Sequence, residues 1–323
     1  MDGLFNVLSA SGSGCCIDSF YAGCFAYADD LFLISPSRQG LQNMLNLASK
    51  YVAEHNITFS TNPDPSKSKT KGIVFSRKKL SFEPKLLLLN GGELPWVNQA
   101  KYLGNEVEAI PNGLLKDAKV KRARYIERNV ELNQEFRHAH PEIKCRINKI
   151  YNSSFPGSVL YDLKSESVRQ LTNSWSASIR QMWDLPYNSH RYLIEQLGGE
   201  HAFSMITIRF INFLKNIQKS EKMAVQLMLQ KVIQNVDSIT GRNIRFIQDK
   251  VGKHCDLLAV SPRWLKSKLI FSPIKAADLW KVNLIKEVTD LKQGVLSLEP
   301  GSVRDDPFTK EQLQDIVNFV SSN

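Results

Sequence analysis

Long apolar runs are missing from this chain of 323 residues, and so are internal repeats and low-complexity tracts. A helix that spans a bilayer needs roughly 18 consecutive apolar residues, and no stretch approaches that length, so we expect no membrane segment. No apolar segment follows a basic start, so we expect no secretory signal either. These absences favour an intracellular protein.

Paired cysteines are missing as well. The cysteines are Cys15, Cys16, Cys24, Cys145 and Cys255. None belongs to a C-x-x-C pair, which argues against a zinc ribbon and against a dithiol redox motif. His254 beside Cys255 is a lone pair, from which we expect no metal site. Unpaired, scattered cysteines indicate a reducing compartment, either cytoplasm or nucleus.

What is present is ordinary globular material with a strong positive charge. Hydrophobic residues make up 42% and charged residues 23% of the chain, so disorder is not expected. The formal net charge is +10. Such a charge favours a polyanionic partner, which on this ground alone is either nucleic acid or an acidic membrane surface.

The most informative stretch is an acidic pair between two apolar runs. Asp29 and Asp30 follow Phe25-Ala26-Tyr27-Ala28 and precede Leu31-Phe32-Leu33-Ile34. Each apolar run is typical of a short buried strand, which predicts a β-hairpin with both carboxylates at its tip. Carboxylate oxygens suit Mg²⁺, and two ions held there would support nucleotidyl transfer. An ordinary hairpin turn is the alternative, because aspartate is common in turns.

Tyr27-Ala28-Asp29-Asp30 resembles the catalytic box of reverse transcriptases of non-LTR (LINE-type) retrotransposons. Other segments resemble motifs of the same family in the same order along the chain. They are residues 4–7, 14–17, 59–63, 67–75, 101–104, 150–153 and 175–180, with Leu185-Pro186 and His190. The resemblance implies an RNA-directed DNA polymerase, and it fades beyond about residue 220.

The resemblance assigns roles at the catalytic centre. It implies that Asp29 binds the catalytic Mg²⁺ or Mn²⁺ and that Asp30 assists at the metal site. By its spacing to Phe75, Lys69 matches a lysine beside the incoming triphosphate, where it could protonate the leaving pyrophosphate. A solvated basic loop is the alternative for Lys69.

The resemblance also implies contacts with substrate, namely an RNA template and a DNA primer. Tyr27 would pack near the primer end, and Leu103-Gly104 would support the primer as part of a primer-grip motif.

One departure from the family is important. The family has a third metal-binding aspartate upstream of this box, whereas only Asp2 and Asp18 precede Tyr27, and neither lies in a matching pattern. We therefore expect the C-terminal part of a polymerase, without its first palm strands and fingers, and inactive by itself. The alternatives are a non-catalytic nucleic-acid-binding remnant and a partly folded relic of a transposable element.

The predicted fold class is α+β. Residues 1–112 are expected to form part of a polymerase palm, with the acidic hairpin, a helix and short antiparallel strands. Residues 113–235 are expected to form an all-helical, thumb-like domain, and residues 236–323 a helical C-terminal extension.

Within the palm-like part, the pattern predicts one helix and several short strands. The helix should cover 38–55, capped by Ser37, with an apolar stripe of Leu41, Met44, Leu45, Ala48 and Val52. The expected strands are 57–60, 73–75, 86–89, 94–97 and 102–103. Asn90-Gly91-Gly92 predicts a hairpin turn.

The first helix of the thumb-like part is crowded with basic residues. Its apolar stripe is predicted to be Val120, Ala123, Ile126 and Val130, facing inward. Basic residues at Lys116, Lys119, Lys121, Arg122, Arg124 and Arg128 would face outward. We expect Lys121, Arg124 and Arg128 to contact a nucleic-acid backbone, because phosphate binding is mostly sequence-independent neutralisation. A solvated helix face is the alternative.

Further apolar stripes predict further helices. The inward residues are expected to be Ile143, Ile147 and Ile150; Val168, Leu171, Trp175, Ile179 and Met182; and Phe203, Ile206, Phe210, Phe213 and Ile217. Residues 283–294 are expected to be helical, and Thr309 with Gln312 resembles a capping box before a last helix.

Overall fold

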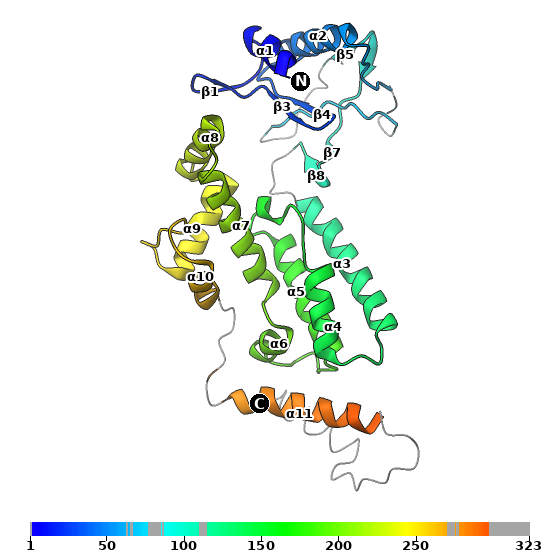
Figure 1. Ribbon diagram of the computed structural model, residues 1–323, viewed down its shortest axis with the longest axis vertical. Coiled ribbons are helices and arrows are strands. Elements are labelled where there is room, and N and C mark those ends of the chain that lie inside the picture. The colour runs from blue at the N-terminus through cyan, green and yellow to red at the C-terminus, as the bar shows by residue number, and fades with distance from the viewer. Residues whose placement is uncertain are drawn as a thin grey trace. The chain divides into compact units, whose positions relative to one another are not determined.

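The computed structural model describes residues 2–62, 64, 67–76, 85, 87–109, 115–269, 275 and 278–296. Helices and antiparallel strands are both present, so the α+β class is confirmed. The chain forms two compact units (Figure 1). The hairpin unit comprises Met1–Leu114 and Leu214–Gly241, and the helical unit comprises Leu115–Phe213 and Arg242–Asn323. The domain boundaries predicted at 112 and 235 stay predictions.

The described sheets of the hairpin unit are all two-stranded and antiparallel. The strand pairs are β1 (Cys16–Ile17) with β2 (Phe20–Tyr21), β3 (Cys24–Tyr27) with β4 (Asp30–Leu33), β5 (Leu87–Leu89) with β6 (Gly92–Leu94), and β7 (Gln99–Tyr102) with β8 (Asn105–Glu108). The helices are α1 (Asp2–Ala10), α2 (Arg38–Glu54) and α8 (Met223–Gln234). The sequence patterns did not predict α1 or the β1–β2 pair.

Helix α2 holds this unit together, and its prediction is confirmed. The Ser37 hydroxyl accepts a hydrogen bond from the Gly40 amide at 3.0 Å, which caps the first turn. Met44 and Ala48 pack against α1, and Leu45 packs against β5. Figure 1 shows α2 beside α1 and β5. The side-chain amide of Gln42 pairs with both backbone polar groups of Leu88, at 2.8 and 2.7 Å. A side chain of the helix thus satisfies the backbone amide and carbonyl that Leu88 presents at the edge of its two-stranded sheet.

Two hairpin turns in this unit need left-handed backbone. Asn90 and Gly91 have φ of 51° and 76°, as a two-residue type I′ turn requires, so the hairpin predicted there is confirmed. Leu103 and Gly104, with φ of 46° and 79°, form the same kind of turn between β7 and β8. The predicted strand at 102–103 is therefore wrong at Leu103, which lies in the turn.

Two further strand predictions are wrong. Residues 57–60 and 73–75 form no strand, and beside the second segment Gly72 forms an isolated parallel bridge with Trp96. Of the strand predicted at 94–97, only Leu94 lies in a strand. Short apolar runs are compatible with several structures, and periodicity does not distinguish them. Leu86 lies outside the described residues.

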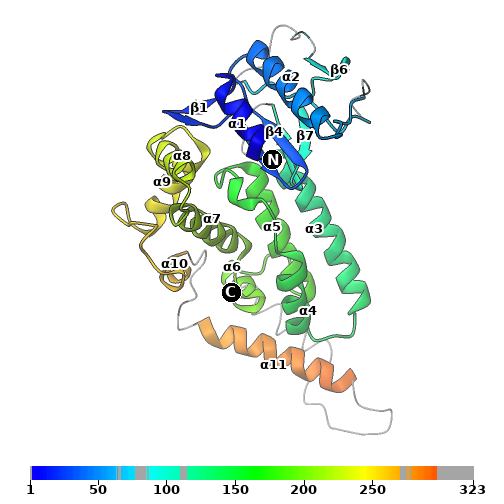
Figure 2. The same ribbon diagram turned by 45° about the horizontal axis from the view of Figure 1, so that its top comes forward.

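The helical unit is built from helices that run along one another. Its elements are α3 (Leu115–Glu135), α4 (Pro141–Ile147), a π-helical turn η1 (Asn148–Asn152), a 3₁₀ turn η2 (Ser158–Leu160), α5 (Glu166–Met182), α6 (Arg191–Gly198), α10 (Pro262–Lys268) and α11 (Leu279–Leu296). Helices α7 (Ala202–Gln218) and α9 (Ile239–Val251) have residues in both units. Figure 2 shows α3 and α5 side by side.

The α5 stripe is confirmed as core. Val168, Leu171, Trp175, Ile179 and Met182 are all buried, and the Ser165 hydroxyl caps the helix through the Val168 amide. This face of α5 packs on other parts of the helical unit, because Trp175 contacts the His201 ring and the Met182 sulfur lies 3.7 Å from that of Cys145 on α4.

The stripe predicted for α3 is wrong. Ile126 and Val130 are exposed, whereas Ala118, Tyr125 and Leu132 are buried. The helix is rotated relative to the prediction, because polar residues on the buried side find partners there. One of these is Lys121, whose ammonium pairs with the Asp117 carboxylate at 2.7 Å and donates to the Pro156 carbonyl.

The next prediction is wrong in the same way. Ile143 and Ile150 were expected to face inward but are exposed, while Lys144, Cys145 and Asn148 are buried. The Asn148 amide donates to the Tyr125 hydroxyl at 3.1 Å. Here too a buried polar contact determines which side of the helix faces the core.

Helix α11 lies against α6 and the start of α4. Lys286 pairs with Glu142 at 3.0 Å, and His140 contacts Asp290 at 2.9 Å. This helix contains the segment predicted at 283–294. Thr309 and Gln312 lie outside the described residues.

Candidate metal and nucleotide site

The acidic pair lies at the tip of a tight hairpin, as the sequence predicted. The expectation that both flanking strands are buried is wrong, because Cys24 is the one buried residue of β3 and no residue of β4 is buried. Cross-strand pairing runs from Cys24–Leu33 to Tyr27–Asp30, which leaves Ala28 and Asp29 as a two-residue turn. Asp29 therefore lies in the turn itself, and Asp30 is the first residue of the returning strand. Both carboxylates are exposed, and Tyr27 is 66% exposed. Neither carboxylate points into a dry core.

The turn has a strained backbone. Ala28 has φ of 54°, a left-handed conformation that costs an L-residue with a Cβ atom roughly 1–2 kcal/mol. Conformations of this kind persist only where the surrounding structure imposes them, and they are concentrated at functional sites. Here the strand pairing on both sides of the turn imposes it.

A second hairpin meets the first one. The rings of Phe32 on β4 and Tyr102 on β7 lie 5.0 Å apart, which joins the β3–β4 and β7–β8 hairpins. Burial raises the pKa of Tyr102, and the negative charge of Asp30 raises it further. The structure therefore brings Asp30 together with the segment that ends in the Leu103-Gly104 turn. Tyr102 was not singled out from the sequence, although it directly precedes the Leu-Gly pair.

Lys69 has a different setting. It is exposed. Two backbone hydrogen bonds hold its segment, from the Gly72 amide to the Pro95 carbonyl at 3.0 Å and from the Val97 amide to the Gly72 carbonyl at 2.8 Å. The Thr70 hydroxyl donates to the Ser60 carbonyl at 2.8 Å. These contacts tie the lysine segment to residues 95–97 and to Ser60, and none of them joins it to Asp29. The role of Lys69 stays a prediction.

The ligand set at the tip is incomplete for two ions. Among the residues that the structure describes, no group of three His, Cys, Asp or Glu side chains lies close enough to hold a metal. Asp29 and Asp30 supply the hard oxygen donors that Mg²⁺ and Mn²⁺ prefer. Mg²⁺ is often held by one or two carboxylates together with water and substrate phosphates, so the tip fits part of such a site.

The basic helix α3 divides into a buried and an exposed part. The Lys121 ammonium pairs with the Asp117 carboxylate at 2.7 Å, and both side chains are buried. It also donates to the Pro156 carbonyl, while the Tyr161 hydroxyl donates to Asp117 at 2.7 Å. A lysine held in this way is not on a surface that a phosphate backbone can reach, so the role predicted for Lys121 is not supported.

Arg124 and Arg128 remain exposed on α3, together with Lys119. We call these three residues the α3 basic face. Lys119 replaces Lys121 in it, because the sequence alone did not reveal which lysine pairs with Asp117.

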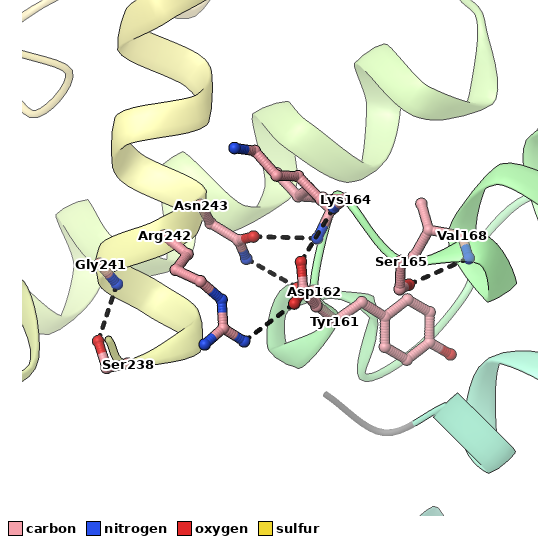
Figure 3. A network of polar contacts seen from close by, with 10 residues as sticks. Tyr161, Asp162, Lys164, Ser165, Val168, Ser238, Gly241, Arg242 and Asn243 are labelled. Carbon is pink, nitrogen blue, oxygen red and sulfur yellow. Dashed lines mark hydrogen bonds and ion pairs between the residues drawn. The ribbon is translucent and has the colours of Figure 1, made fainter. Parts of the chain in front are cut away.

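The Tyr161 region links distant parts of the helical unit (Figure 3). The buried hydroxyl of Tyr161 has a raised pKa, because burial and the hydrogen bond to Asp117 both disfavour the phenolate. Asn243 on α9 donates to the Tyr161 carbonyl at 2.7 Å and accepts from the Leu163 amide at 2.9 Å, and Arg242 pairs with Asp162 at 3.0 Å. This network fastens α9 to the segment before α5, so its role is structural.

Neither a protein-family model nor a curated protein sequence matches the chain. Among the described residues, no helix combines the length and the apolar character needed to cross a membrane.

Proposed function

We propose that the β3–β4 hairpin is a divalent-metal site for nucleotidyl transfer, in a chain that forms part of an RNA-directed DNA polymerase resembling those of non-LTR retrotransposons. The observation that carries the proposal is the exposed Asp29-Asp30 pair on a strained two-residue turn. The contact between Phe32 and Tyr102, which brings the second hairpin beside it, supports the proposal.

The two hairpins would have different roles, with the ion bound at one and the primer contacted by the other. A bound Mg²⁺ would polarise phosphate oxygens and favour ionisation of an attacking hydroxyl. Asp29 and Asp30 provide the negative charge that holds the ion. Leu103, 46% exposed at the tip of the neighbouring hairpin, offers an apolar surface on which a primer nucleotide could rest.

Binding of a nucleotide with metal is the direct test. A fluorescent dNTP analogue should bind the chain in the presence of Mg²⁺, and the Asp29→Asn, Asp30→Asn variant should lose the metal-dependent part of this affinity. The matched control is Glu54→Gln, Glu93→Gln, which removes two exposed charges from the same unit. Equal binding by the wild type and both variants would contradict the proposal.

Primer extension tests the catalytic step separately. Two carboxylates supply only part of a two-metal shell, and loss of members of a catalytic constellation usually costs several orders of magnitude. We expect no template-directed dNTP incorporation above background on an RNA template with Mg²⁺ or Mn²⁺. Extension by the wild type that Asp29→Ala, Asp30→Ala lacks would show a complete site and overturn this expectation.

The alternative is a nucleic-acid-binding protein without catalysis, which the exposed α3 basic face favours. Each phosphate contact contributes about 0.7–0.9 to the slope of log affinity against log salt. Replacing Lys119, Arg124 and Arg128 with glutamine should therefore lower the slope by about 2–3. The control replaces three exposed basic residues elsewhere, Lys253, Arg263 and Lys268. An unchanged slope in the first variant would remove the α3 basic face from the binding surface.

A further inference from the structure

The end of α5 carries an arginine that is partly buried without a full set of partners. The Nε atom of Arg180 is inaccessible to solvent and has no hydrogen-bond partner among the described residues. Burial lowers the pKa of Arg180, and the nearby charge of Arg191 lowers it further. A guanidinium remains charged nonetheless, and a desolvated charge is costly until an anion or further hydrogen bonds compensate it.

Tyr187 lies directly beside this arginine. The Arg180 guanidinium is 5.7 Å from the centre of the Tyr187 ring, within cation–π range. The tyrosine is 91% exposed, which is unusual for so large an aromatic side chain. Although Arg180 lies near the ring, most of the surface of the Tyr187 side chain remains open to a ligand.

The loop that carries Tyr187 is fixed on both sides. The Leu185 amide donates to the Arg180 carbonyl at 2.9 Å, and the Ser189 amide and hydroxyl donate to the Pro186 carbonyl at 3.1 and 2.7 Å. Ser189 itself is buried. The exposed ring is therefore presented by an ordered turn, so little conformational entropy would be lost when a ligand stacks on it.

Helix α6 begins a few residues further on, at Arg191, which is also exposed. Its charge lies near enough to affect Arg180, and it also contributes to the lowered pKa of the buried His201. The surface between α5 and α6 therefore combines two arginines with one exposed aromatic ring. Arginine forks bind phosphate, and an aromatic ring stacks on any base.

We propose that Arg180, Tyr187 and Arg191 form a binding site for single-stranded nucleic acid, in which Tyr187 stacks on a base and the arginines bind the flanking phosphates. This proposal goes beyond the metal site, because it concerns the helical unit and holds whether or not the β3–β4 hairpin binds an ion. It also differs from the α3 basic face, because stacking requires an unpaired base whereas charge neutralisation does not.

The test is fluorescence anisotropy with the full chain at one salt concentration. The probes are labelled oligo-dT and oligo-rU of equal length, a duplex of that length and an abasic strand. Tyr187→Ala should weaken binding of both single strands roughly tenfold, the size of one base-stacking contact. Tyr187→Phe, which keeps the ring, should bind like the wild type. The two single-stranded arms show whether DNA or RNA is preferred.

Matched controls separate stacking from general charge. Tyr151→Ala removes a tyrosine that is 68% exposed elsewhere in the same unit, and it should leave affinity unchanged. Arg180→Gln should lower the salt slope by about 1, whereas Arg263→Gln should not. Circular dichroism should be the same for the wild type and both Tyr187 variants, because the Tyr187 side chain is almost fully exposed.

Three results would overturn the proposal. The first is unchanged affinity in Tyr187→Ala. The second is an equal loss on the single strands, the duplex and the abasic strand, which would make the contact purely electrostatic. The third is absence of binding to any of the oligonucleotides by the wild type, which would leave a protein partner as the ligand of this surface.

Discussion

The two units place polar side chains in opposite ways. In the hairpin unit, Asp29 lies in the exposed two-residue turn of the β3–β4 hairpin, at the end of the hairpin away from the buried Cys24. In the helical unit, Asp117 and Lys121 are buried between helices and joined by a short ion pair. A tip residue contacts little and is free to bind a ligand, whereas a buried ion pair stabilises the fold and is not available to a ligand.

The largest expected effect comes from breaking the buried ion pair. Asp117→Ala leaves the Lys121 ammonium and the Tyr161 hydroxyl without their shared carboxylate. Removing one partner of a buried ion pair typically costs about 3–5 kcal/mol of unfolding free energy. Chemical denaturation followed by the helical circular dichroism signal would measure this loss.

Two comparison variants sharpen that result. Glu166→Gln breaks an exposed pair with Arg169, and it should not change stability measurably, because exposed pairs contribute little. Asp117→Leu combined with Lys121→Met and Tyr161→Phe removes the three polar side chains of this network at once, and it should recover much of the lost stability. A small effect of Asp117→Ala would mean that the buried pair does not stabilise the helical unit.

The second largest expected effect is a dependence of the stability of the helical unit on pH. Burial lowers the pKa of His201 to about 4, and the charge of Arg191 acts in the same direction. In the unfolded chain the histidine titrates near 6.5, so between these values the unfolded state binds a proton that the folded state does not. Stability should therefore fall by about 3 kcal/mol as the pH decreases from about 6.5 to about 4.

The His201→Asn variant isolates this contribution. It should reduce the decrease in stability over that pH range, whereas His254→Asn, at an exposed position, should not. Carboxylates titrate in part of the same range, so the difference between variants is the quantity to compare. Identical pH profiles for the wild type and His201→Asn would contradict the prediction.

The smallest effect is expected at the hairpin tip. Ala28→Gly should stabilise the hairpin unit by about 1 kcal/mol, because glycine adopts the left-handed conformation without the Cβ penalty. Ala26→Gly, in the adjoining strand, should instead destabilise it by about 0.5–1 kcal/mol. Thermal unfolding of both variants would measure the two effects, and destabilisation by Ala28→Gly would show that the turn is not strained.

The same contrast explains which features the sequence could predict. Turns are local, so the tip at Asp29 and the turn at Asn90-Gly91 were predictable, and so was the apolar stripe around Trp175. The buried side of α3 was not predictable, because Lys121 is held by partners such as Pro156, and Tyr161 reaches Asp117 from another part of the unit. The exposed Tyr187 was missed because no periodic pattern distinguishes a stacking ring from a surface residue.

Metal binding by the Asp29-Asp30 tip, as we propose it, is open to direct measurement. Backbone amide NMR signals of the full chain should be followed while small amounts of Mn²⁺ are added, because a bound paramagnetic ion broadens signals near it. We predict selective broadening at Tyr27 to Asp30 and at Tyr102, reversed by excess Mg²⁺ and absent from Asp29→Asn, Asp30→Asn. Uniform weak broadening across the chain, or the same broadening in the double variant, would contradict this proposal.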